Sequence, residues 1–173
     1  MPLNKEAEET TIVSSLKVRW KGILDWPEFY KKTKSQLKEM GYGDERKNFV
    51  ESKYVERLKG ESKNVEIAWK GEKSVDDYIT RVIEVTFLII GLKDVEFENN
   101  GTKTKMNSAD IEIKFNAKLI TNKKGAYKKT SLMKKVYENF LIADLIERNK
   151  IDIYKDIYKV HDEVKNRLNL TNY

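Results

Sequence analysis

The chain contains no cysteine and only one histidine, His161. Without cysteine there can be no disulfide framework, no thiolate nucleophile and no cysteine-ligated zinc site. His161 falls within an apolar helical stripe, and no second histidine is present to share a metal ion. We therefore interpret it as a core or interface residue rather than as a catalytic base, and we expect no cofactor.

Long apolar runs are also missing. The longest one, residues 85–91, includes a threonine and is far shorter than the roughly 20 residues that cross a bilayer. No basic start followed by an apolar core and a small-residue cleavage site is found, so we expect no secretory signal. We predict a cytoplasmic protein with no membrane span.

The familiar catalytic signatures are absent as well: there is no Gly-rich phosphate loop, no G-x-S-x-G and no H-E-x-x-H. Paired acids such as Asp110 and Glu112 share one face of a predicted strand, but it is the exposed face, where charge is ordinary. We expect no enzymatic activity.

What the sequence does contain is apolar patterning along most of its 173 residues, enough for one domain with a core. The first ten residues are an exception, because they carry three glutamates and almost nothing to bury. We predict a flexible acidic tail over residues 1–10 and a single α+β domain over residues 11–173.

Alternating apolar residues predict about six antiparallel strands. The clearest strand covers 110–120, with Ile111, Ile113 and Phe115 on one face and charged residues on the other. The strand over 79–90 is apolar on both faces, which predicts a central strand whose second face is covered, for example by another subunit. After Gly91, residues 95–97 form a short run before the Asn-Gly turn at 100–101.

Two helices are predicted. Asp25 stands three residues before Glu28, the spacing of a helix start, and Gly41 supplies the stop. A second helical pattern continues from about residue 131 to 168, and an unbroken helix of that size would be about 57 Å long. Because a strand of ten residues covers only about 33 Å, we expect this helix to bend near Asn149 or to pack against a partner. The predicted fold is a curved antiparallel sheet on a long C-terminal helix, in the order β-α-β-β-β-β-β-α.

This order of elements resembles the helix-grip architecture of START and Bet v1-like proteins, over most of the chain. The resemblance implies a sheet that wraps the last helix, often around a ligand cavity, although one helix follows the first strand here where that family usually has two. The residues we name as cavity lining, which could equally fill a solid core, are Trp20, Trp69, Phe87, Phe115 and Tyr137. The phrases at 25–30 (DWPEFY) and 76–78 (DDY) are similar to conserved archaeal proteins, a likeness that implies no activity.

Lysines concentrate between Thr121 and Lys135, where six of them and no acid supply +6, equal to the net charge of the whole chain. They are Lys123, Lys124, Lys128, Lys129, Lys134 and Lys135. Such a block could contact the phosphates of nucleic acid. A solvated surface is the commoner explanation, and the lack of arginine argues against specific recognition.

The leading hypothesis is a non-catalytic binding or assembly protein that meets a second copy or another protein through the C-terminal helix or the central strand. The predicted interface residues on that helix are Tyr154, Ile157, His161, Val164 and Leu168. Two alternatives remain open: a carrier of small apolar ligands with a helix-grip cavity, and a nucleic-acid-binding protein that uses the segment Lys123–Lys135.

Overall fold

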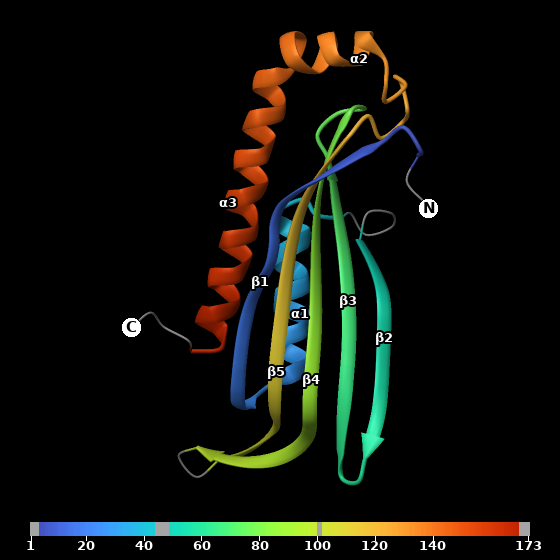
Figure 1. Ribbon diagram of the computed structural model, residues 1–173. Coiled ribbons are helices and arrows are strands. Elements are labelled where there is room, and N and C mark those ends of the chain that lie inside the picture. Colours follow the sequence, from blue (N-terminus) through green and yellow to red (C-terminus); the bar gives the residue numbers. More distant parts are fainter. Residues whose placement is uncertain (1–3, 44–48, 100–101, 170–173) are drawn as a thin grey trace.

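The computed structural model describes residues 4–43, 49–99 and 102–169, and it shows a five-stranded antiparallel sheet with helices packed on one face (Figure 1). The strand order is β1-β5-β4-β3-β2, so the first strand lies beside the last. The bounds are β1 (Glu8–Leu24), β2 (Phe49–Lys59), β3 (Ser62–Ser74), β4 (Ile79–Asn99) and β5 (Thr102–Thr121). The α+β class and the packing of the C-terminal helix on the sheet are as predicted.

The predicted count of about six strands is wrong by one, because β4 does not end at Gly91. The pairing of β4 with β5 shifts register between Ile90 and Lys93, and Gly91 adopts a φ of +67°. Glycine takes such a φ without steric cost, so the strand bends through a bulge instead of stopping. The Asn64 side chain accepts the Gly91 N–H at 3.0 Å. The short run 95–97 is therefore the second half of β4, and the Asn-Gly turn at 100–101 lies outside the described residues.

Helix α1 (Trp26–Glu39) begins and ends as predicted. Asp25 is its N-cap, and its carboxylate accepts the Glu28 N–H at 2.9 Å. At the other end Gly41 adopts a φ of +85°, and the Tyr42 N–H returns to the Leu37 carbonyl at 2.9 Å. Both ends are thus satisfied by local hydrogen bonds.

The core lies between the inward face of the sheet and two helices, α1 and α3 (Ala143–Arg167). Its centre is aromatic: the Trp69 and Phe87 rings lie 4.6 Å apart, and Trp26 of α1 contacts Phe87 edge-on. From α3 four residues are fully buried in it, Ile153, Ile157, Val160 and Val164.

The C-terminal segment bends, but at Ile142 and not near Asn149. It consists of α2 (Leu132–Val136), the π-helical turn η1 (Tyr137–Leu141) and α3, and Ile142 between the last two has non-helical angles. Asn149 lies buried inside α3, where its amide donates to the Leu145 carbonyl at 2.8 Å and accepts from Arg81 at 2.7 Å. An asparagine that the sequence suggests as a breaker therefore attaches the helix to β4.

The predicted flexible tail over residues 1–10 does not hold for residues 4–10. Strand β1 already begins at Glu8, and Ala7 is buried against Val82 and Ile120 on the outer face of the sheet. Two of the glutamates that suggested a tail pair with cations, Glu8 with Lys134 at 2.6 Å and Glu9 with Lys118 at 3.0 Å, and Glu6 accepts the backbone N–H of Lys129 at 2.7 Å. The second face of the central strand is thus covered at this end by the chain itself.

Most of the outer face is charged. Lys118 bridges Glu9 and Glu84, and Glu112 lies between Arg19 and Lys114. Farther along β4 the apolar residues Leu88 and Ile90 are exposed, so the expected cover over the central strand is only partial.

Candidate functional site

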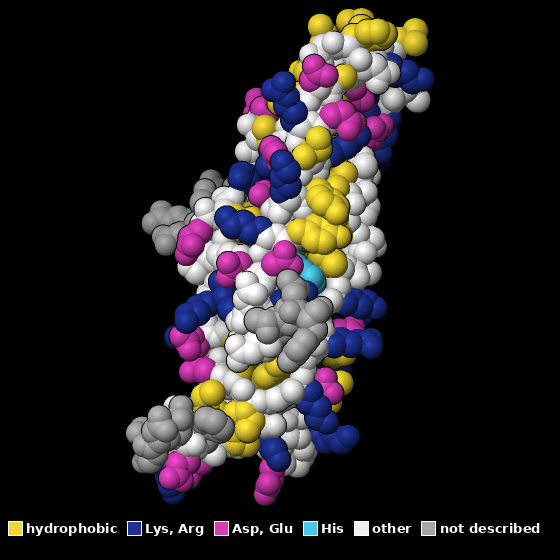
Figure 2. All heavy atoms as spheres, turned by 90° about the vertical axis from the view of Figure 1, so that its left-hand side faces the viewer, with side chains coloured by type: hydrophobic (Ala, Val, Ile, Leu, Met, Phe, Trp, Pro, Cys, Tyr) yellow, Lys and Arg dark blue, Asp and Glu magenta, His cyan; other side chains and the backbone are white. Residues whose placement is uncertain are grey.

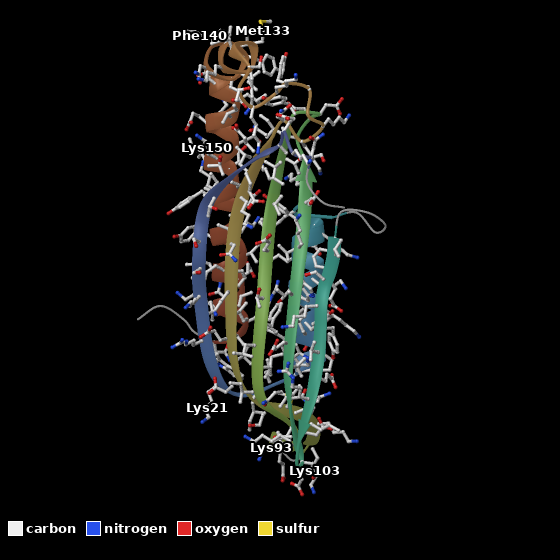
Figure 3. The ribbon with its side chains drawn as sticks, turned by 45° about the vertical axis from the view of Figure 1, so that its right-hand side comes forward. Lys21, Lys93, Lys103, Met133, Phe140 and Lys150 are labelled. Atoms are coloured by element: carbon white, nitrogen blue, oxygen red, sulfur yellow. The ribbon has the colours of Figure 1, made fainter. Side chains whose placement is uncertain are left out.

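Apolar side chains gather at one end of the molecule, on α2 and η1 (Figure 2). The exposed fractions are 77% for Leu132, 68% for Met133, 50% for Val136, 81% for Phe140 and 72% for Leu141. We call these five residues the apolar tip. Met133 and Phe140 lie at the outermost end of the molecule, beyond the sheet (Figure 3).

Helix α2 turns a charged side chain toward the protein and its apolar side chains toward solvent. The side of α2 that faces the protein carries Lys134, only 2% exposed, whereas Leu132, Met133 and Val136 face outward. The Lys134 ammonium is held by Glu8 of β1 at 2.6 Å and lies 3.7 Å from Glu138. A surface helix in water normally shows the opposite arrangement, with apolar residues inward and charges outward.

An anchor beneath the tip fixes this orientation. Glu138 accepts the Tyr78 hydroxyl at 2.7 Å, and the Tyr78 and Tyr137 rings meet edge-on at 5.2 Å. Burial, and then this hydrogen bond to Glu138, raise the pKa of Tyr78 above its ordinary value. Tyr127 packs on Tyr137 from the loop before α2, at 5.4 Å. The segment is thus attached to the sheet by polar and aromatic contacts, and its aliphatic side chains are left outside.

The six lysines of the segment Lys123–Lys135 divide into two groups. Lys123 pairs with Glu72 and Lys124 with Asp77, each at 2.6 Å, and Lys134 is buried. The other three are exposed and have no side-chain ion pair within the described residues: Lys128, Lys129 and Lys135. We call these three the lysine collar, because they lie on α2 and in the turn that leads into it. Three of the six lysines that we predicted to contact anions therefore already pair with acidic side chains of the same chain.

The predicted interface residues on α3 are mostly covered by the chain's own sheet. Ile157, Val164 and Leu168 are buried in the core. The His161 ring stands edge-on to Phe115 at 5.9 Å and is largely covered. Of the five, only Tyr154 presents a large exposed side chain, stacked beside Tyr158.

The predicted cavity-lining residues do not come together around one space. Trp69, Phe87 and Phe115 are buried in the core, where Trp69 packs against Phe87 and donates its ring N–H to Glu51 at 2.9 Å. Tyr137 lies under the apolar tip. Trp20 is partly exposed at the far end of the molecule and lines a hollow of about 340 Å³ there.

A second hollow of about 440 Å³ lies between α1 and α3, and we call it the α1–α3 groove. Its rim is charged, and its lining residues are Lys32, Ser35, Gln36, Glu39, Met40, Lys159, Glu163 and Arg167. Gln36 is buried, yet neither its amide nitrogen nor its amide oxygen has a hydrogen-bond partner among the described residues. A buried amide without partners is costly, so this side chain is suited to bind a polar group in the groove.

Carboxylates on the sheet have lowered pKa values because of hydrogen-bond donors beside them, which are cations for Glu66 and Glu112 and first the Tyr54 hydroxyl, then Lys63, for Glu56. Burial raises the pKa of Glu72, but its hydrogen bonds to Lys123 and Lys70 outweigh that effect and lower it overall. Arg81 likewise joins Asp152 of α3 to β4 at 2.6 Å. Across residues 4–43, 49–99 and 102–169 no group of three or more acidic or histidine side chains is placed to hold a metal ion. These charges thus stabilise the sheet and attach α3 to it.

No family model matches the chain, and no curated protein matches it either. In the part of the chain that the structure describes, none of the helices is both long enough and apolar enough to cross a membrane. The apolar tip is the surface that the sequence analysis missed. The sequence places these residues within the helical pattern over 131–168, and that pattern alone does not show that they face outward.

Proposed function

We propose that this protein is a non-catalytic binding protein that docks onto a larger partner through the apolar tip. The observation that carries the proposal is the inverted helix α2, which buries Lys134 and exposes Leu132 and Met133. Because the anchor of Glu8, Glu138 and Tyr78 holds α2 in this orientation, the exposure is built into the fold.

Energetics support this proposal. Covering a fully exposed Leu, Met, Val or Phe side chain is worth about 1.5–3 kcal/mol, so the five residues of the tip offer several kcal/mol to a partner. Apolar surfaces concentrated in this way mark interaction sites more often than isolated exposed residues do. Elsewhere the exposed apolar residues form smaller groups: Leu58 lies between Arg57 and Lys59, and Leu88 and Ile90 form a pair on the outer face of β4.

Self-association through α3 and nucleic-acid binding by the lysine segment have less support from the structure than docking through the apolar tip. A self-associating α3 would use Ile157, Val164 and Leu168, which already pack against the chain's own sheet. A nucleic-acid site on the lysine segment would have to release Lys123 and Lys124 from their acidic partners.

The test compares two double variants on a hydrophobic-interaction column. Met133→Ser with Phe140→Ser shortens the retention of the wild type clearly, because it removes the centre of the tip. Val50→Ser with Leu58→Ser, which removes exposed apolar side chains from β2, changes retention much less. If the tip variant were retained as strongly as wild type, the tip would be covered in solution and the proposal would fail.

A second candidate function is the binding of a small polar ligand in the α1–α3 groove, favoured by the unpartnered amide of Gln36. A ligand with an adjacent donor and acceptor, such as an amide, would satisfy both of its atoms. Native mass spectrometry of protein purified from its own cells tests this: wild type retains a small molecule and the variant Gln36→Leu does not. This candidate is removed if wild type and variant retain the same added mass, or if neither retains a small molecule.

A further inference from the structure

We propose that the partner of the apolar tip is the surface of a lipid bilayer that contains anionic headgroups. This inference rests on the docking function proposed above and names its partner. The tip would insert its side chains at the boundary between headgroups and acyl chains, as interfacial amphipathic helices do, to a depth of about 5–10 Å.

The first argument is position. Segment α2–η1 lies across one end of the elongated molecule, and the sheet and α3 extend away from it (Figure 1). Met133 and Phe140 are the labelled residues at that extreme (Figure 3). An apolar surface at the end of a molecule can meet a flat bilayer without obstruction from the rest of the protein.

The second argument is charge. The lysine collar of Lys128, Lys129 and Lys135 borders the tip and has no side-chain ion pair in the described structure. The acid closest in sequence to the tip, Glu138, is turned inward toward Lys134 and Tyr78. Outward apolar residues beside unpaired lysines complement a bilayer whose apolar interior lies under negative headgroups.

The same charges argue against a second copy as the partner. In a symmetric dimer the same surface lies on both subunits, so two lysine collars would come together and repel. Nucleic acid would satisfy the collar, but it offers no apolar layer for Leu132, Phe140 and Leu141. A bilayer offers negative headgroups to the lysine collar and an apolar interior to the apolar tip.

The binding experiment uses the full chain and sedimenting vesicles of either pure phosphatidylcholine or phosphatidylcholine with 30% phosphatidylglycerol. The wild type is expected to bind the anionic vesicles and to bind the neutral ones far more weakly. A lysine near an anionic surface strengthens binding by roughly fivefold, so the triple variant Lys128→Gln, Lys129→Gln, Lys135→Gln is expected to lose about 100-fold. The double variant Met133→Ser, Phe140→Ser is expected to lose binding to both kinds of vesicle.

A matched control separates this site from the general attraction of a basic protein. The variant Lys17→Gln, Lys21→Gln, Lys31→Gln also lowers the net charge from +6 to +3, and it removes exposed lysines outside the collar. Lys21 lies at the opposite end of the molecule from Met133 (Figure 3). The control is expected to bind anionic vesicles within about threefold of wild type, which is less than the fivefold effect of one collar lysine. Thermal unfolding of every variant confirms that it is folded.

Three results would overturn the inference. One is equal loss of binding in the collar and control variants, which would show unspecific attraction. Another is the absence of vesicle binding while the hydrophobic column still detects an exposed tip. That result would retain the proposal that the tip docks onto a partner and reject a lipid bilayer as that partner. The third is a tip-dependent dimer in sedimentation velocity without vesicle binding, which would assign the surface to a second copy.

Discussion

Helix α3 and the segment α2–η1 carry similar apolar patterns and lie in opposite surroundings. In α3 the residues at three- and four-residue steps, such as Ile153 and Ile157, are buried against the sheet. In α2–η1 comparable residues, such as Val136 and Phe140, face outward. Apolar periodicity therefore shows which side of a helix is apolar, but the tertiary partners decide whether that side is buried in the chain's own core.

The different orientations of α3 and α2 come from the polar side of each helix, opposite its apolar residues. Outward positions of α3 such as Lys155 and Lys159 are exposed, and nothing draws them inward. In α2 the opposite side carries Lys134, which finds Glu8 and Glu138 under it. A buried ion pair with good geometry can thus orient a short helix against its hydrophobic preference, as buried polar groups specify register in other systems.

The largest expected effect is the difference in stability between a truncation in the buried side of α3 and one in the apolar tip. Ile157→Ala leaves a cavity in a closed core and should lower the free energy of unfolding by about 3–4 kcal/mol. Phe140→Ala removes a side chain that is mostly in water and should cost less than about 0.5 kcal/mol. Urea unfolding of both variants measures this contrast. Similar costs would mean that the tip is packed within the protein.

The next effect concerns the buried lysine. Lys134→Ala leaves the inward-facing Glu138 without its cation and should cost about 2–3 kcal/mol, less than a fully buried pair because Glu8 is partly exposed. Its neighbour gives the control: Lys135→Ala should change the stability by less than about 0.5 kcal/mol. Urea unfolding at neutral pH compares them. Equal effects would show that α2 has no fixed orientation.

A smaller effect is expected at alkaline pH. Because burial and the hydrogen bond to Glu138 raise the pKa of Tyr78, its contribution to stability is complete below its ordinary pKa of 10 and is lost as the pH rises further. Hydrogen exchange should therefore show residues 132–141 losing protection above pH 10 before residues 153–164 do. Tyr78→Phe should remove about 1 kcal/mol at pH 7 and abolish this early loss. If both segments open together in wild type, the anchor does not act locally.

The features that depend on neighbours in sequence are the ones that the sequence predicts. The alternation in β5, the Asp25 cap and the Gly41 stop of α1 all follow from nearby residues, and the structure contains each of them. The bulge at Gly91 was missed because glycine can either end a strand or bend it, and the pairing with β5 decides between the two.

The apolar tip could not be predicted for a related reason. Its orientation depends on Glu8, which stands near the opposite end of the chain and was assigned to a flexible tail. Periodicity places Lys134 and Phe140 on different faces but does not identify the face that turns inward. The bend at Ile142 leaves no trace in composition, whereas Asn149, which resembles a breaker, makes tertiary hydrogen bonds.

The most direct test of the account uses the absence of native cysteine, which makes a single introduced thiol a unique probe. A nitroxide spin label at Phe140→Cys reports by electron paramagnetic resonance whether that position is in water, lipid or protein, and the same label at Leu58→Cys on β2 is the control. We predict that a water-soluble relaxation agent reaches both labels in buffer, and that anionic vesicles shield the label at position 140 and increase its access to oxygen, while position 58 does not change. A label at 140 that is immobile and shielded in buffer, or that stays in water with vesicles present, would contradict the account.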